Sequence, residues 1–209
     1  MTTTPDFDRL YADDPDPWQV ATSWYERRKI DVVLSSLRRP AYPVVWDAGC
    51  GTGELAAALV GRAEALLATD ASTEAVALAS ARLAEAPSAR VELSRLPDRP
   101  AGLESPPDLV VLSELLYYLS SRDRAATYAL VDEVAAPDAD LVLVHWSPRP
   151  DDAHCSGLES FNEASVALNA RGWGRIVTHT DAEFLLGLFS RDVPAEVGGR
   201  DDDTDEELR

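Results

Sequence analysis

The chain has few of the features that mark a secreted or membrane protein. Its 209 residues include two cysteines, Cys50 and Cys155, which are too few for a disulfide framework. Residues 1–14 contain no apolar stretch suited to a signal peptide. No later run approaches the ~20 apolar residues that a membrane span needs. We therefore expect a cytoplasmic protein without a membrane partner.

Positive charge is also scarce. Lysine and arginine together number 19 against 37 acidic residues, which gives a formal net charge of −18, and Lys29 is the only lysine. Phosphate contacts need clustered basic side chains, so this composition argues against a nucleic-acid partner. The three histidines, His145, His154 and His179, lack a short ligand spacing, and no CxxC or HxxxH pattern occurs. We expect no metal site.

The length and patterning predict one folded domain between two polar ends. We expect a loose segment over 1–16, a single domain over 17–193, and an acidic, disordered tail over 194–209. Strand and helix signals alternate through the domain, which favours an α/β fold with helices on both faces of a sheet. The expected strands are 43–48, 65–70, 90–94, 108–113, 140–146, 174–179 and 184–190. The expected helices are 18–37, 53–61, 72–85, 121–135 and 157–171.

The last two expected strands discriminate between α/β folds. Only residues 180–183 separate them, which is too short for a parallel crossover, so they should form an antiparallel hairpin. The result is a Rossmann-like, seven-stranded, mostly parallel sheet with a C-terminal antiparallel hairpin. A plain dinucleotide-binding fold lacks that hairpin.

Glycines recur at every second position after the first expected strand, at Gly49, Gly51 and Gly53, and Asp47 precedes them. Glycine tolerates positive φ and has no Cβ, so the backbone can turn sharply and approach a ligand closely. A strand that ends in such a loop and feeds a helix builds a nucleotide site in α/β sheets. The spacing differs from the G-x-G-x-x-G of dinucleotide sites. A tight turn without a ligand is the alternative interpretation.

A second acid supports the nucleotide interpretation. Asp70 ends the next expected strand, about twenty residues further on, where a carboxylate can accept the two ribose hydroxyls. Ser72 follows and can cap the next helix. Two acids at the ends of neighbouring strands predict a nucleoside site.

Five segments then occur in order along the chain: DPDPW at 14–18, SWYERRK at 23–29, the glycine loop, LSELLYYL at 112–119 and LVHW at 143–146. Together they resemble the nodulation-protein-S-like (NodS-like) branch of class I S-adenosylmethionine (SAM) methyltransferases. The resemblance implies that fold, SAM as cofactor and S-adenosylhomocysteine (SAH) as product. The founding activity of the branch is N-methylation of the free amine on a deacetylated chitooligosaccharide. An amino sugar or related amine is therefore the implied acceptor.

The expected helix 18–37 suggests how the methionine end of the cofactor is held. Successive helical residues advance by ~100°, so Trp24 and Arg28 share a face with Tyr25 beside them. Our hypothesis is that Arg28 pairs with the methionine carboxylate and that Trp24 or Tyr25 shields the sulfonium. Arg27 is an alternative partner for the carboxylate. A surface helix with stacked side chains is the structural alternative.

The remaining cofactor assignments follow from position. Asp47 would bind the ammonium of the methionine tail, Cys50 would offer its amide, and the amide of Leu96 would contact the adenine. The full set of expected cofactor-binding residues is Trp24, Tyr25, Arg28, Asp47, Gly49, Cys50, Gly51, Gly53, Asp70, Ala71, Ser72, Leu96 and Ser113.

The end of the fourth expected strand faces the transferable methyl group in this fold. Glu114 and Tyr117 are therefore the first candidates for acceptor binding and proton handling. His145, at the end of the next strand, could also take a proton, or it could be a structural residue. Tyr118 and Trp146 are expected to bind the acceptor, although Tyr118 could instead pack in the core.

The leading hypothesis is a SAM-dependent methyltransferase that N-methylates an amino sugar or related small amine. O-methylation of a sugar or small acid is the nearest alternative. An NAD-linked oxidoreductase and a non-catalytic SAM-binding protein are alternatives from other classes.

Overall fold

Seven strands form one sheet in the order β3-β2-β1-β4-β5-β7-β6. The computed structural model describes residues 5–192, so the predicted tail at 194–209 lies outside the described residues. The strands are β1 (Tyr42–Ala48), β2 (Ala63–Asp70), β3 (Ala89–Leu93), β4 (Leu109–Ser113), β5 (Asp140–Trp146), β6 (Gly174–Thr180) and β7 (Phe184–Ser190). Neighbouring strands pair in parallel except β7, which is antiparallel to both β5 and β6. The predicted terminal hairpin and fold class are confirmed.

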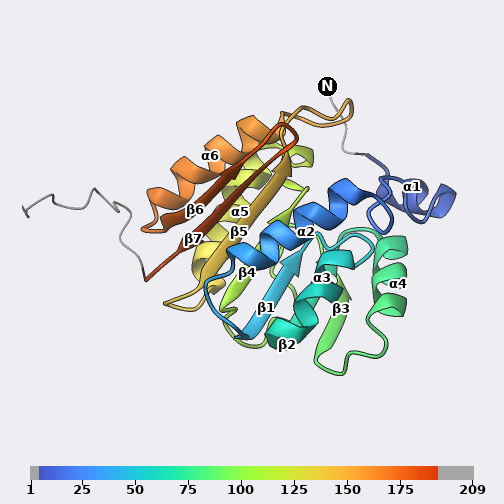
Figure 1. Ribbon diagram of the computed structural model, residues 1–209, viewed down its shortest axis with the longest axis horizontal. Coiled ribbons are helices and arrows are strands. Elements are labelled where there is room, and N and C mark those ends of the chain that lie inside the picture. The colour runs from blue at the N-terminus through green and yellow to red at the C-terminus, as the bar shows by residue number, and fades with distance from the viewer. Residues whose placement is uncertain (1–4, 193–209) are drawn as a thin grey trace, which may run out of the picture.

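Six α-helices and two 3₁₀ turns accompany the sheet within residues 5–192 (Figure 1). They are α1 (Phe7–Asp13), α2 (Trp24–Ser36), α3 (Glu54–Leu59), η1 (Val60–Arg62), α4 (Thr73–Arg82), η2 (Leu116–Tyr118), α5 (Ser121–Val134) and α6 (Gly157–Asn169). No helix of this described part is long and apolar enough to span a bilayer.

The alternation of side chains along each strand divides the core between the two faces of the sheet. On one face, Trp46 and Leu143 pack with α5 and α6. On the other, Val45 and Val144 pack with α2 and α3. Because the central strands are covered on both faces, they read as nearly continuous apolar runs.

The N-terminal region differs from the prediction in two places. Residues 7–13 are not loose but form α1, since the Asp6 side chain accepts a hydrogen bond from the Arg9 amide at 3.2 Å and caps the helix. The expected helix 18–37 begins six residues later, at Trp24. Gln19 has a φ of 56°, which breaks a helix at that point, and Ser23 then supplies the N-cap.

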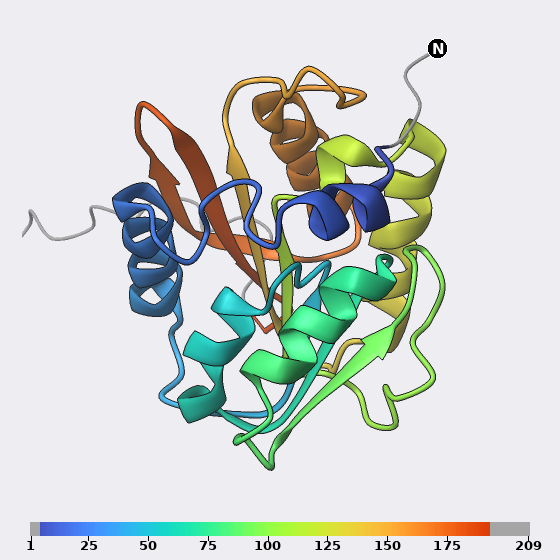
Figure 2. The same ribbon diagram turned by 90° about the vertical axis from the view of Figure 1, so that its right-hand side faces the viewer.

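The chain between α1 and α2 crosses over the carboxyl ends of the central strands (Figure 2). This connection and α1 together, residues 5–23, are called the N-terminal strap below. The glycine loop and the tips of β2, β4 and β5 lie at the same end of the sheet. The fold therefore gathers its loop residues beneath the strap.

Candidate functional site

The glycine loop follows a left-handed path from β1 to α3. Gly49, Gly51 and Gly53 have φ values of 75°, 53° and 81°, a region that L side chains rarely adopt. A Cβ at Gly49 would also stand 2.7 Å from the side chain of Leu115. The Gly49 amide donates to the Thr69 carbonyl at 2.7 Å, which ties the loop to β2. Both conformation and close packing thus require glycine here.

Asp70 joins the tip of β2 to this loop. Its Oδ2 accepts from the Gly51 amide and its Oδ1 from the Ser72 amide, each at 2.9 Å. Burial raises the pKa of Asp70, although these backbone hydrogen bonds oppose the shift. Ser72 does not line the cavity described below. Its hydroxyl accepts from the Ala75 amide at 3.2 Å and caps α4, so its expected cofactor contact is replaced by a structural role.

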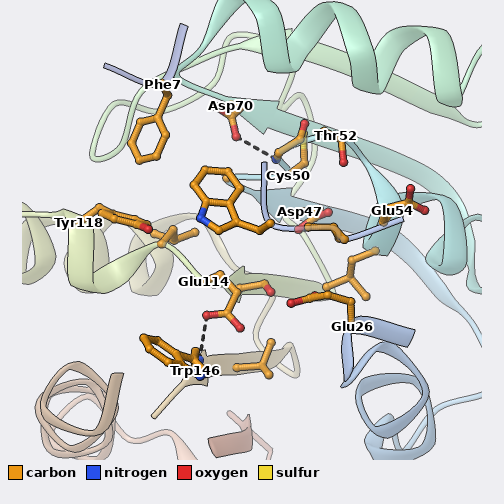
Figure 3. A pocket seen from close by; sticks show the side chains of 18 of the residues that line it. Phe7, Glu26, Asp47, Cys50, Thr52, Glu54, Asp70, Glu114, Tyr118 and Trp146 are labelled. Carbon is orange, nitrogen blue, oxygen red and sulfur yellow. Dashed lines mark hydrogen bonds between the residues drawn. The ribbon is translucent and has the colours of Figure 1, made fainter. Parts of the chain in front are cut away.

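A cavity of about 450 Å³ opens between the glycine loop, the strap, α2 and the tips of β2, β4 and β5 (Figure 3). Small-molecule sites commonly occupy roughly 300–1,000 Å³. The sequence-predicted residues that line it are Tyr25, Asp47, Gly49, Cys50, Gly51, Asp70, Ala71, Leu96, Ser113, Glu114, Tyr117, Tyr118 and Trp146. The tertiary structure therefore brings most of the predicted site into one space.

Asp47 is the unusual group in this cavity. Its side chain is 1% exposed and points into the cavity (Figure 3), yet neither carboxylate oxygen has a hydrogen-bond partner among residues 5–192. Burial, with Asp70 as a lesser cause, raises the pKa of Asp47 to about 7. Buried carboxylates are normally paired or hydrogen-bonded. The arrangement fits a ligand that brings hydrogen-bond donors or positive charge to Asp47.

Cys50 lines the cavity, but its amide, which was predicted to contact the cofactor, has a partner within the protein. The Cys50 amide already donates to the Thr69 carbonyl at 2.9 Å and is not offered to a ligand. Burial, followed by the charges of Asp47 and Asp70, raises the pKa of the Cys50 thiol well above its usual range. The thiol therefore stays protonated and is a poor nucleophile.

Aromatic side chains of the strap form one wall of the cavity, and none of them was predicted as a site residue. The Phe7 ring lies 5.1 Å from that of Tyr118 and 6.4 Å from that of Trp18, and the Tyr11 ring lies 5.6 Å from that of Trp18. Phe7 and Tyr11 are four residues apart in an amphipathic pattern, and that spacing was the available signal. The strap therefore contributes contact area to the site.

Helix α2 presents a different face to the cavity than predicted. Tyr25, Glu26 and Lys29 line the cavity, whereas Trp24 is 68% exposed and Arg28 does not line it. Arg28 instead forms an ion pair with Asp181 at 2.5 Å, which ties α2 to the β6–β7 hairpin. Packing of α2 on the sheet sets its rotation, so Trp24 and Arg28, which were predicted to hold the cofactor, do not line the cavity.

The alternative carboxylate partner and two other expected residues also lie elsewhere. Arg27 is exposed and does not line the cavity. Gly53 N-caps α3, and a Cβ there would stand 3.1 Å from that of Ala79, so it permits helix packing instead of ligand contact. Within residues 5–192 no group of three or more His, Cys, Asp and Glu side chains is arranged to hold a metal.

A buried charge cluster connects α2 to the end of β4. The Lys29 ammonium lies 2.8 Å from Oε2 of Glu26 and 2.5 Å from Oε1 of Glu114. Burial alone would lower the pKa of Lys29, but the two carboxylates outweigh it and raise that pKa. Neither Glu26 nor Lys29 was predicted as a site residue, although a single lysine in so acidic a chain was a signal.

Glu114 stands at the end of β4 with a φ of 56°. Its Oε2 accepts from the Tyr117 hydroxyl at 2.6 Å. The same oxygen accepts from the Trp146 amide at 2.8 Å, as Figure 3 shows. Burial would raise the pKa of Glu114, but Lys29, His145 and the hydrogen bonds bring it below its ordinary value. Glu114 is therefore a fixed carboxylate at the cavity wall.

His145 is not a cavity residue. It is fully buried, and its Nε2 accepts from the Leu116 amide at 3.2 Å. Burial lowers the pKa of His145 to about 4. A neutral imidazole packed beneath η2 does not line the cavity, which favours the structural alternative over the predicted catalytic role.

The geometry combines two chemical environments. One part, around the glycine loop and Asp70, offers the unpaired carboxylate of Asp47. The other part offers the fixed carboxylate of Glu114 beside aromatic rings. Such a cavity can hold an extended ligand with a positive group next to a second, smaller molecule.

Comparison with known proteins adds independent information. A family model described as a methyltransferase domain matches residues 46–141. A crystal structure from Pseudomonas syringae, described as a "putative Methyltransferase", is 37% identical, covers 81% of this chain and all of its own, and has a TM-score of 0.69. No curated protein sequence matches the chain.

Two more distant structures share the fold. N-methyltransferase NodS from Bradyrhizobium japonicum WM9, in complex with SAH, is 21% identical, with 92% of this chain and 100% of that chain covered and a TM-score of 0.75. An O-methyltransferase family protein from Burkholderia thailandensis is 15% identical, with 91% and 63% covered and a TM-score of 0.72. The first of these structures is described as an N-methyltransferase and the second as an O-methyltransferase family protein. The shared fold therefore does not decide which nucleophile accepts the methyl group.

Proposed function

The chain belongs to the class I SAM-dependent methyltransferases, and from that premise we propose that it methylates the nitrogen of a small amine, such as an amino sugar. The observation that carries the choice of nitrogen is the fixed Glu114 carboxylate in an acidic cavity.

The residues present fit the cofactor. Asp47 is an orphaned buried carboxylate, and the methionine tail of SAM carries an ammonium that would satisfy it. Asp70 stands at the tip of β2, where a carboxylate can accept ribose hydroxyls. Ala71 and Leu96 line the cavity beside it for the adenine, and Tyr25 is the predicted aromatic residue of α2 that does reach the cavity. When bound, SAM supplies a methyl group on a positively charged sulfur.

The cavity wall favours a cationic acceptor. Six carboxylate side chains line it, against two basic ones. The acids are Asp16, Glu26, Asp47, Glu54, Asp70 and Glu114, and the bases are Lys29 and Arg95. A cavity with walls of one sign attracts ligands of the opposite sign, so amines are drawn in and carboxylic acids are repelled.

The part of the cavity around Glu114, where the acceptor would bind, provides orientation more than proton transfer. Because the pKa of Glu114 is lowered, its carboxylate stays charged, accepts a hydrogen bond from the amine and is a weak base. An amine that enters as an ammonium would first release its proton to water. Held by Glu114 as a neutral nucleophile, it would then take the methyl group that SAM supplies when bound, and the methylated ammonium would lose its proton to water. Aligning two bound reactants can contribute ~7–11 kcal/mol, which suits this arrangement.

O-methylation of a hydroxyl is less well supported. An alcohol needs its proton removed as it attacks. His145 is buried away from the cavity and the pKa of Glu114 is lowered, so neither predicted base suits that task. An amine presents its lone pair without such help once it is neutral.

Methyl transfer to matched acceptors tests the proposal. The protein would be incubated with SAM labelled in its methyl group and with glucosamine, benzylamine, glucose or benzoate, and the products identified by mass spectrometry. We expect labelled glucosamine or benzylamine and no labelled glucose or benzoate. Transfer to glucose or benzoate alone would overturn N-methylation. Binding of NAD but not SAH in calorimetry would overturn the cofactor assignment, and tight SAH binding with no transfer to either amine would favour a non-catalytic role.

A further inference from the structure

Lys29 is the only lysine in the chain, and it is 4% exposed. Its ammonium lies 5.0 Å from the centre of the Tyr25 ring and contacts the carboxylates of Glu26 and Glu114. A buried ammonium is costly unless it is paired and hydrogen-bonded, and here two carboxylates pair it. Lys29 is therefore fully engaged and cannot serve as a binding site for an anionic ligand.

The cluster of Glu26, Lys29 and Glu114 carries an excess of one negative charge when both carboxylates are ionised, although burial raises the pKa of Glu26. Figure 3 shows Glu26 and Glu114 directed toward the same part of the cavity. One lysine cannot neutralise two ionised carboxylates, so the cluster can still attract one positive group. Lys29 therefore reduces the negative potential of the two carboxylates without cancelling it.

Three elements fix the orientation of Glu114. Lys29 of α2 holds Oε1, while the Tyr117 hydroxyl of η2 and the Trp146 amide of β5 hold Oε2. Glu114 itself adopts a φ of 56°, which costs a non-glycine residue some strain. A strained carboxylate with both oxygens held by separate elements is preorganised, as a binding group for a reacting molecule should be.

We propose that Lys29 is a positioning residue for the acceptor, because it holds Glu26 and Glu114 together and so fixes the Glu114 carboxylate that binds the acceptor nitrogen. This inference rests on the proposed function, and it goes further in assigning roles to Glu26 and Lys29. A purely structural role, in which Lys29 only fastens α2 to β4, is the competing explanation.

The two explanations differ in their pH dependence. The titratable groups that face Glu114 are Lys29, Glu26 and Tyr25 of α2, Tyr117 and Tyr118 of η2, and His145 of β5. Without Lys29, burial and the like charge of Glu26 would raise the pKa of Glu114. Glu114 would then become protonated as the pH falls through a higher value than in the wild type, and acceptor binding would be lost there.

The experiment compares kcat/KM for the better of glucosamine and benzylamine across pH in wild type, Lys29→Met, Lys29→Arg and Arg27→Met. Dividing each variant's kcat/KM by the wild-type value removes the titration of the amine itself. Arg27→Met is the matched control, since it removes a positive charge from the exposed side of the same helix. SAH affinity, measured by calorimetry, shows whether each variant keeps its cofactor site.

For Lys29→Met we expect SAH affinity within about threefold of wild type. We also expect its kcat/KM ratio to fall with decreasing pH, because kcat/KM of the variant starts to fall at least about one pH unit above the pH at which that of the wild type does. Lys29→Arg should restore a flat ratio, and Arg27→Met should give a flat ratio near one. A ratio for Lys29→Met that is reduced but flat with pH would overturn the inference while leaving N-methylation intact. Wild-type protein that binds SAH but methylates neither amine would overturn the proposed function itself, and this inference with it.

Removal of Lys29 leaves two buried carboxylates facing one another and can prevent folding. The double variant Lys29→Met/Glu26→Gln removes one charge of each sign and avoids that repulsion. Because Glu114 still loses Lys29 as its partner, we expect the kcat/KM ratio of the double variant to fall with decreasing pH, as it does in Lys29→Met. A flat ratio in the folded double variant would also overturn the inference.

Discussion

The Asp70 carboxylate accepts a hydrogen bond from the Gly51 amide across 2.9 Å and thereby joins the tip of β2 to the glycine loop after β1. Its other oxygen accepts from the Ser72 amide at the start of α4. One side chain thus fixes the relative positions of two loops that line the cavity. Any ligand that lies across both strand tips depends on this link.

Replacing Asp70 with alanine should therefore remove cofactor binding. Hydrogen bonds to a charged group contribute about 1.5–3 kcal/mol each, so losing two to a ribose predicts an affinity for SAH lower by about 100-fold or more. Calorimetric titration with SAH measures this. Asp70→Asn, which keeps the size of the side chain, should lose less, and an unchanged affinity in Asp70→Ala would contradict the ribose assignment.

Asp47 should make SAH binding release protons near neutral pH. Its folded pKa of about 7 lies above its ordinary value of 3.8, so at pH 7 about half of the free protein carries a proton there. A ligand ammonium beside Asp47 favours the ionised form and expels that proton. Calorimetry at pH 7 in phosphate and in Tris, which differ in ionisation enthalpy, should give different binding enthalpies, and equal enthalpies would count against the contact.

The same carboxylate predicts how stability depends on pH. Between pH 4 and 7 the folded state binds more protons at Asp47 than the unfolded chain does, so this group makes the free energy of unfolding fall as pH rises. Asp47→Asn should remove this contribution, and the ligand-free variant should melt at a higher temperature than wild type at pH 8 while binding SAH more weakly. A variant that is both less stable at pH 8 and equally tight for SAH would refute the prediction.

Glu114→Gln should separate turnover from cofactor binding. The amide cannot supply the charge that attracts an amine. If its oxygen accepts from Tyr117 and Trp146, its NH₂ group faces the Lys29 ammonium and cannot accept from it. We expect kcat/KM for the amine to fall at least tenfold with SAH affinity nearly unchanged. The exposed Glu104→Gln is the matched control and should behave as wild type.

Alanine at three glycines separates backbone strain from steric clash. Gly49 has positive φ and a Cβ there would lie 2.7 Å from Leu115, Gly172 has positive φ but open space, and Gly61 has neither constraint. A left-handed conformation costs a side chain roughly 1–2 kcal/mol. Thermal melts should rank Gly61→Ala closest to wild type, Gly172→Ala lower and Gly49→Ala lowest, and only Gly49→Ala should also weaken SAH. A different order would mean that another contact dominates.

Two tryptophans test the contribution of the strap. Trp18 lines the cavity, whereas Trp24 is exposed outside it. Trp18→Ala should weaken SAH binding several-fold because it removes apolar contact area, and it should reduce the change in intrinsic fluorescence on binding. Trp24→Ala should leave both unchanged. Equal effects of the two substitutions would argue that the strap does not contact the ligand.

Much of the fold was predictable because its signals are local. The apolar runs of β1 and β4, the alternation of strands with helices and the short turn before β7 each depend on neighbouring residues. The glycine loop and Asp70 were predictable for the same reason, since strand ends and positive φ favour particular residue types. The beginning of α2 was predicted in the wrong place because Gln19 breaks the helix with a positive φ, which a glutamine does not predict.

The site residues that were misassigned share a different cause. Arg28 and Lys29 are adjacent basic residues on one helix, and their sequence does not say which will face the cavity. The docking of α2 on the sheet turns Lys29 inward to Glu114 and Arg28 outward to Asp181. His145 likewise sits at the active-site end of β5, but strand pleating buries it behind η2 and presents Trp146 instead.

The sequence by itself determined the sheet, the glycine loop and the two acids at its edge, because each depends on residues close together along the chain. Only the tertiary structure decided which face of α2 and which residue of β5 meet the ligand, and that the strap closes one wall. Those outcomes depend on the rotation and packing of whole elements, which contacts between distant residues set.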